Sequence, residues 1–91
     1  MRQIALFVAI AGTLAAAEAA QAGSLGRPCT SAPQSQWLSM QALEAKVEAL
    51  GYKVRKSKLK AACGEIYTID KNGVRVELFV DPTSGDIVGR L

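Results

Sequence analysis

The chain has 91 residues, with 11 basic and 8 acidic side chains, a formal net charge of +3 and no histidine. This length allows at most one domain, and so mild a positive charge does not favour nucleic acid as the partner. Two cysteines without histidine are too few for a four-ligand zinc site, which excludes the common structural zinc domains.

Residues 1–22 have the pattern of a cleavable signal peptide. Arg2 supplies a positive charge, and residues 4–17 form an uncharged apolar run. Residues 20–22 (Ala-Gln-Ala) have the small-x-small pattern that signal peptidase recognises, and residues 17–19 offer a second such site. An uncleaved membrane anchor is the alternative, but the run is shorter than the roughly 20 residues of a spanning helix. We therefore expect a periplasmic or secreted protein with no stable membrane anchor after cleavage.

Residues 23–36 are rich in Gly, Pro, Ser and Thr and predict an irregular N-terminal arm. Both cysteines, Cys29 and Cys63, lie after the signal peptide, and disulfides persist in the compartments to which exported proteins travel. A redox motif would hold its cysteines close together, as in C-x-x-C. We therefore predict a structural disulfide that joins the arm to the second strand and stabilises a small domain by roughly 3–4 kcal/mol.

An amphipathic helix is predicted over residues 40–50. Ser39 can cap its N-terminus, and Gly51 stands where a helix-ending glycine belongs. Trp37, just before the helix, is expected to fill part of the core; the alternative is that Trp37 and Tyr67 line a ligand groove. The apolar stripe that would face the core comprises Met40, Leu43, Val47 and Leu50.

After the helix, apolar and polar residues alternate with the period of β-strands. The first strand begins at Tyr52, and its phase must be reset by a bulge or loop near residues 56–58. Gly64 is expected to mark a second break. The remaining predictions are a strand over residues 65–70, a turn over 70–73, a strand over 74–81, a turn over 81–85 and a short strand over 86–89.

The predicted order of one helix followed by three to four strands defines the fold class. Tight connections late in the chain make neighbouring strands antiparallel, and one helix across the sheet would bury both apolar surfaces. We expect an α+β domain over residues 37–91, in which one amphipathic helix packs on a small antiparallel sheet and a disulfide pins the arm.

The motifs of residues 37–91 resemble those of PepSY-like domains from exported bacterial proteins, in particular the short stand-alone subgroup. The resemblance implies the same fold and a role in binding and restraining a protease or another envelope protein, and it carries no catalytic motif. Because no protease follows this domain in the sequence, we expect any restraint to act in trans. The matching motifs are Gly51-Tyr52-Lys53-Val54, Cys63-Gly64-Glu65-Ile66-Tyr67, Lys71-Asn72-Gly73 and residues 76–87.

The most unusual feature is a basic run with five positive charges in eight positions. It could bind an acidic partner, or it could be a solvated strand whose lysines protect a sheet edge. The charges occupy both parities, so they cannot share one face of a regular strand. Nucleic acid is disfavoured because no aromatic residues are interleaved to stack on bases. The run comprises Lys53, Arg55, Lys56, Lys58 and Lys60.

No catalytic constellation is evident, because histidine is absent and both thiols are expected to be paired. Metal ligands and cofactors are not predicted either, since the turn aspartates Asp70, Asp81 and Asp86 are explained by turn chemistry. We expect a non-enzymatic binding module for an unidentified envelope protein, bound through a sheet edge or the basic run. The alternative is an envelope protein that binds a small molecule or a metal ion.

Overall fold

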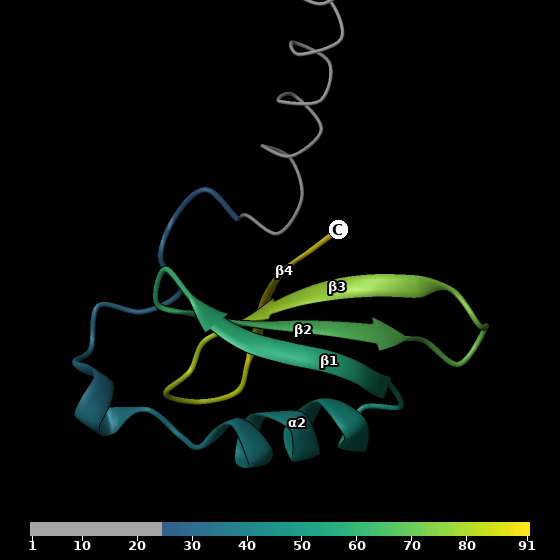
Figure 1. The fold of residues 1–91 in the computed structure, drawn as a ribbon, viewed down its shortest axis with the longest axis horizontal. Coiled ribbons are helices and arrows are strands. Elements are labelled where there is room, and N and C mark those ends of the chain that lie inside the picture. Colours follow the sequence, from purple (N-terminus) through teal and green to yellow (C-terminus); the bar gives the residue numbers. More distant parts are fainter. Residues whose placement is uncertain (1–24) are drawn as a thin grey trace, which may run out of the picture.

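The computed structural model describes residues 25–91, so the predicted signal peptide lies outside the described residues. The described strands form one antiparallel sheet in the order β1-β2-β3-β4, and the helix α2 lies along one of its faces (Figure 1). The predicted α+β fold is therefore confirmed. Its elements are η1 (Gln34–Gln36), α2 (Met40–Ala49), β1 (Lys53–Lys60), β2 (Cys63–Ile69), β3 (Arg75–Val80) and β4 (Ile87–Arg90).

Helix α2 begins and ends at the predicted caps. The Ser39 side chain accepts a hydrogen bond from the Ala42 N–H at 3.1 Å, which satisfies one N–H that the first turn leaves unpaired. Gly51 follows the helix with a φ of 102°, a conformation that glycine adopts without steric cost. The predicted apolar stripe is wrong at Leu50, which is 60% exposed because it lies beyond the last helical residue.

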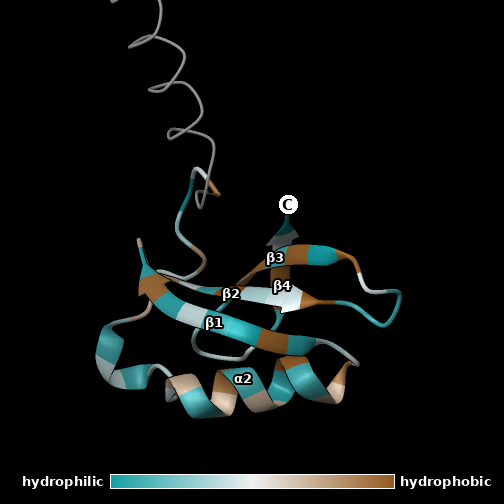
Figure 2. Cartoon of the chain, turned by 45° about the vertical axis from the view of Figure 1, so that its right-hand side comes forward, coloured by the Kyte–Doolittle hydropathy of each residue, from teal (hydrophilic) through white to brown (hydrophobic). Residues whose placement is uncertain are grey.

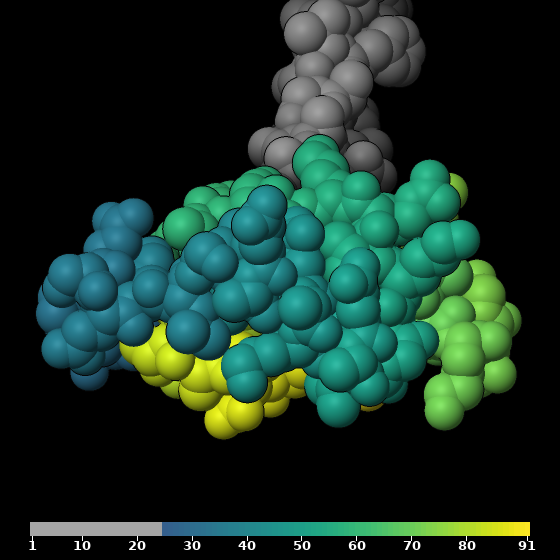
Figure 3. Space-filling view, turned by 90° about the horizontal axis from the view of Figure 1, so that it is seen from below, coloured from purple at the N-terminus to yellow at the C-terminus, as the bar shows by residue number. Residues whose placement is uncertain are grey.

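The core lies between α2 and the sheet. It consists of Leu43, Val47, Ile66, Leu78 and Val80, with β1 contributing partly buried side chains at its margin. The colouring by hydropathy agrees with this position of the core. Apolar and polar positions alternate along α2, whereas β1, at the margin of the core, is largely hydrophilic (Figure 2). Seen from the helix side, atoms of α2 lie in the middle of the molecule, with atoms of its C-terminal part beside them (Figure 3). This face of the sheet is thus dry and filled.

Gly64 does not break a strand, contrary to the prediction, but lies within β2. A Cβ atom at this position would lie 2.7 Å from Val80 Cγ2 and 3.3 Å from Leu43 Cδ1. Both distances are shorter than ordinary van der Waals contact, so the absent side chain allows Leu43 of the helix to approach the sheet closely. Gly64 is therefore a packing residue.

The two later turns follow the chemistry predicted for them. Asp70 Oδ1 accepts hydrogen bonds from the Asn72 and Val74 N–H groups, each at 2.9 Å, in the turn between β2 and β3. Asp81 Oδ1 accepts from the Thr83 N–H at 2.8 Å before β4. The turn between β1 and β2 differs, because its residues Ala61 and Ala62 have φ angles of 52° and 61°, in the left-handed region.

The predicted disulfide joins Cys29 to Cys63, with an S–S distance of 2.02 Å and a Cα–Cα distance of 4.9 Å. Cys63 is the first residue of β2, so the bridge pins the arm to the start of the second strand as expected. The Cys29 N–H also donates to the Ala62 carbonyl at 3.3 Å. A disulfide fits a location outside the cytoplasm, because the reducing systems of the cytoplasm would open it.

The arm is not wholly irregular, because it contains the short 3-10 helix η1. Trp37 follows this helix, and its indole N–H donates to the Ala32 carbonyl at 3.0 Å. This residue is half-buried and does not belong to the core cluster, so the prediction that it fills the core is wrong. Trp37 instead stabilises the part of the arm that leads into α2, through its hydrogen bond to Ala32. Among residues 25–91, no helix has the length and apolar character needed to cross a bilayer.

Candidate functional site

A β-bulge in β1 decides where the basic run points. Val54 pairs with Thr68 and Lys56 pairs with Tyr67, so that Arg55 has no partner in β2. The sequence predicted such a bulge near residues 56–58, and the structure places it one position earlier, at Arg55. One extra residue reverses the alternation of side chains beyond it, so residues of opposite parity reach the same side of the sheet.

As a result, the whole basic run shares the face of the sheet that α2 does not cover, which we call the open face. Lys53 lies opposite Ile69 before the bulge, and the lysines beyond the bulge lie opposite Tyr67, Glu65 and Cys63. These charges could not share one face of a regular strand, and the bulge is what brings them to the same face. The paired basic residues are Lys53, Lys56, Lys58 and Lys60, and Arg55 lines a pocket on the same face.

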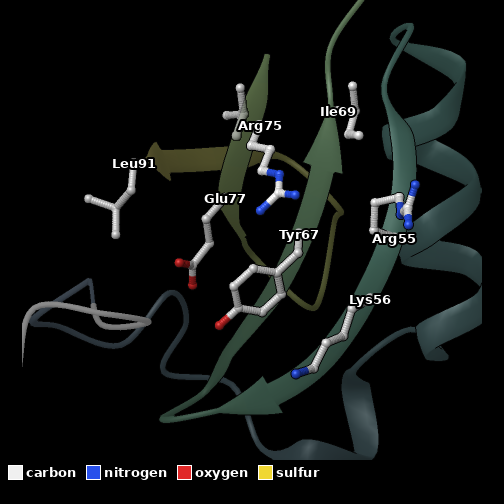
Figure 4. A pocket seen from close by; sticks show the side chains of 8 residues that line it. Arg55, Lys56, Tyr67, Ile69, Arg75, Glu77 and Leu91 are labelled. Atoms are coloured by element: carbon white, nitrogen blue, oxygen red, sulfur yellow. The ribbon is translucent and has the colours of Figure 1, made fainter. Parts of the chain in front are cut away.

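The open face carries a pocket of about 550 Å³ that spans β1, β2 and β3, which we call the face pocket. Three cationic side chains contribute to its lining, Tyr67 lies near its centre, and Glu77 lies on the side away from β1, toward Leu91 (Figure 4). Glu77 lies opposite Tyr67 across the β2–β3 pair. The lining residues are Arg55, Lys56, Tyr67, Ile69, Arg75, Val76, Glu77 and Leu91.

Tyr67 is the aromatic centre of the open face. The Lys56 and Lys58 ammonium nitrogens lie 5.6 and 5.9 Å from the centroid of its ring, within the range of a cation–π interaction. Burial raises the pKa of the Tyr67 phenol, and the negative charge of Glu77 raises it further. The phenol therefore stays protonated at neutral pH and can donate a hydrogen bond. Its ring also holds the two lysines against the sheet.

Glu65 is the buried carboxylate of the open face, with only 2% of its surface exposed. Burial raises its pKa, and the positive charge of Lys58, whose Nζ lies 3.8 Å from Glu65 Oε1, partly opposes the rise. Within residues 25–91, two buried oxygens have no hydrogen-bond partner, Glu65 Oε1 and Glu77 Oε2. Buried polar atoms are normally hydrogen-bonded, so these two carboxylate oxygens are exceptions among the buried polar atoms of the described residues.

The arm covers the opposite end of the open face. Leu25 Cδ1 lies 2.5 Å from the place where a Cβ of Gly89 would be, so the arm occupies the space that this glycine leaves. Phe79, the neighbour of Gly89 across β3 and β4, is completely buried although it faces away from the core. A second pocket of about 370 Å³ lies between the arm, Lys60 and Glu65.

Sequence reasoning identified the basic run but did not assemble the rest of the face pocket. The alternation of side chains along β3 places Arg75 and Glu77 on the face opposite the core, and the pairing with β2 places Glu65 and Tyr67 on the same face. What was missing was the register that aligns these pairs with β1. No group of three or more acidic, cysteine or histidine side chains that could hold a metal ion occurs within residues 25–91.

Comparison with models of known protein families gives a match. The sequence model of the PepSY family described as "Peptidase propeptide and YPEB domain" matches residues 5–90. The resemblance noted from the motifs is thereby confirmed. Neither a curated protein nor a solved structure matches the chain.

Proposed function

Because the chain belongs to the PepSY family of peptidase propeptide and YPEB domains, we propose that it is an exported, non-enzymatic module that binds a protein partner. The partner is an envelope or secreted protein, and the family's occurrence in peptidase propeptides favours a protease that the module restrains in trans. The disulfide between Cys29 and Cys63 supports an oxidising destination, periplasmic or secreted.

The observation that carries the proposal is the bulge at Arg55, which collects the five charges of the basic run on the open face. The net charge of the whole chain is only +3, so this local concentration is much greater than the composition indicates. A surface with one dominant sign of charge attracts complementary partners and speeds their association. The open face is therefore the binding surface that we propose.

The edge of β1 is a weaker candidate for the same role. β1 ends the sheet, so strand addition along it is geometrically conceivable. However, bulges and lysines are the devices by which proteins protect edge strands from pairing with other chains. Both occur in β1. We therefore assign partner binding to the open face, and we expect the bulge and the lysines to keep the edge of β1 from pairing with other chains.

The experiment compares two variants with the same loss of charge. In one, Lys56, Lys58 and Lys60 are changed to Gln; in the other, Lys46, Lys71 and Arg90, which lie off the open face, are changed to Gln. Each mature, oxidised protein is used to capture partners from periplasmic and secreted fractions and is added to those fractions while casein hydrolysis is followed. We expect wild-type protein to capture the partner and to inhibit casein hydrolysis, and we expect only the open-face variant to lose both activities. Identical behaviour of the two variants would overturn the proposal.

One observation favours a second candidate function, an envelope protein that binds a small molecule. The face pocket, at about 550 Å³, is large enough for a small organic anion. Native mass spectrometry of the protein purified from the periplasm distinguishes the two functions. A retained small ligand would favour this second function, whereas an unliganded mass together with capture of a protein favours the first.

A further inference from the structure

The turn between β2 and β3 contains the only asparagine of the chain, Asn72, and Gly73 follows it directly. Both residues are exposed. Apart from the adjoining residues, no heavy atom of residues 25–91 lies within 4 Å of the place where a Cβ of Gly73 would be. The φ of Gly73 is 83°, a conformation that its missing side chain allows. The peptide bond between Asn72 and Gly73 is therefore open to solvent where a side chain would otherwise shield it.

An asparagine that precedes a glycine can lose its side-chain amide by reaction with the backbone. The nitrogen of the glycine gives up its proton to a base in the solvent and forms a bond to Cγ of the asparagine. The bond from Cγ to Nδ2 breaks, and the amide nitrogen takes up a proton and leaves as ammonia. Water then adds to either carbonyl of the resulting succinimide ring and opens it to aspartate or isoaspartate. The reaction consumes only water.

In this turn the two reacting groups are held differently. The Asn72 side chain is exposed, whereas the attacking nitrogen is restrained, because the Gly73 N–H donates to the Asp70 carbonyl at 2.9 Å. The Asp70 carboxylate also accepts hydrogen bonds from the Asn72 and Val74 N–H groups, each at 2.9 Å. The peptide has to leave these hydrogen bonds before its nitrogen can reach Cγ. Local opening of the turn therefore sets the rate of reaction, and Asp70 sets how often the turn opens.

The turn lies at one end of the open face. It joins Ile69 to Arg75, which pair across β2 and β3 and both line the face pocket. Aspartate at position 72 would add one negative charge to a chain whose net charge is +3. Isoaspartate would add the same charge and would also lengthen the backbone of the turn by one carbon atom. Because the turn fixes the register of a hairpin, the second product would also disturb the pairing of Ile69 with Arg75.

We propose that Asn72 is a site of spontaneous deamidation, whose rate is set by the hydrogen bonds of Asp70 and whose products lower the positive charge at this end of the open face as the protein ages. This modification site goes beyond the proposed binding function and does not depend on it.

The test incubates the mature, oxidised protein at mildly alkaline pH, where the attacking nitrogen loses its proton more often. Ion-exchange chromatography follows the more acidic product, tandem mass spectrometry locates the change, and labelling by isoaspartyl methyltransferase detects isoaspartate. We expect Asn72 to convert in the wild-type protein and no acidic product to form in Asn72→Ser.

A synthetic peptide of residues 66–76, which lacks the sheet, gives the rate without the restraint of the fold. We expect the peptide to convert about tenfold to a hundredfold faster than the protein, because the protein must first break the hydrogen bonds of the turn. If Asn72 of the protein is still intact after about a hundred half-lives of the peptide, the proposal is wrong.

Three variants test the role of Asp70. Asp70→Ala should convert about fivefold or more faster than wild type, because both hydrogen bonds to its carboxylate are lost. Asp81→Ala is the matched control, since Asp81 accepts the Thr83 N–H at 2.8 Å in the turn before β4, and its rate should stay within about twofold of wild type. Asp70→Ser, whose hydroxyl can accept similar hydrogen bonds without a charge, should lie between wild type and Asp70→Ala.

Equal acceleration in Asp70→Ala and Asp81→Ala would mean that the reaction follows unfolding of the whole domain, which overturns the role assigned to Asp70. Equal acceleration in Asp70→Ala and Asp70→Ser would assign the effect to the charge of Asp70 and would also overturn the role of its hydrogen bonds.

Discussion

The two faces of the sheet are made by the same strands, yet they carry side chains of opposite character. Toward α2, β2 and β3 present Ile66, Leu78 and Val80, which are completely buried. On the open face, the same strands present Tyr67 and Glu77 beside the basic residues of β1. Alternation along each strand thus separates the side chains that stabilise the fold from those available for binding. Substitutions on the two faces should accordingly affect different measurements.

The largest effect on stability is expected from truncation on the covered face. Leu43→Ala removes a completely buried side chain from the core and should lower the free energy of unfolding by about 3–4 kcal/mol. Ile69→Ala removes the same number of carbon atoms from the open face, where the side chain is only half-buried, and should cost about 1 kcal/mol. Urea denaturation of the two oxidised variants measures both values. Equal losses in the free energy of unfolding would contradict the conclusion that the covered face stabilises the fold more than the open face does.

A somewhat smaller effect is expected from loss of the disulfide, which joins the arm to the open face. Changing Cys29 and Cys63 together to Ser should lower the free energy of unfolding by about 3 kcal/mol, in line with a loop of this length. Because Leu25 of the arm packs over Gly89, the cross-strand neighbour of the buried Phe79, the variant should also loosen the packing there and bind a hydrophobic dye. Wild-type protein treated with a reductant serves as the control and should behave in the same way. An unchanged urea midpoint would mean that the arm adds nothing to stability.

The smallest effect is expected at Glu65, the buried carboxylate of the open face. Because burial raises its pKa in the folded state, the folded protein binds more protons than the unfolded chain between the ordinary and the raised pKa. Stability contributed at this site is therefore present at pH values below the ordinary pKa and is lost as the pH rises through the raised one.

Glu65→Gln should remove this pH dependence and, at pH 7, raise the free energy of unfolding by less than about 1 kcal/mol. Urea denaturation at several pH values between 4 and 8 measures the slope for both proteins. Glu77→Gln, at a less buried position on the same face, is the matched control. A variant that is less stable than wild type at pH 7 would show that the contact with Lys58 outweighs the cost of burial.

Local chemistry made most of the fold predictable from the sequence. The Ser39 cap, the glycine after the helix and the aspartate turns depend on residues a few positions apart, and each was found where expected. Gly64 was misjudged because its role depends on Val80 and Leu43, which are distant in sequence. Leu50 was misjudged because the helix ends one residue earlier than the periodicity indicated.

The candidate site was less predictable for a related reason. Charge counting identified the basic run, but the side of the sheet on which each residue lies depends on the position of a single unpaired residue. The sequence required a change of phase in β1, and only the register against β2 places it at Arg55. Glu77 and Arg75 join the site through pairing across strands, which no local pattern specifies.

The left-handed turn at Ala61 and Ala62 has a consequence for the timing of assembly. Such a conformation costs roughly 1–2 kcal/mol for each residue with a side chain, and neither alanine has the glycine or asparagine chemistry that would relieve it. The bridge at Cys63 and the hydrogen bond from Cys29 to Ala62 hold this turn closed. Closure of the β1–β2 hairpin is therefore less favourable before the disulfide forms than after it. The strand that bears the lysines is thus held in its register more firmly once the disulfide has formed.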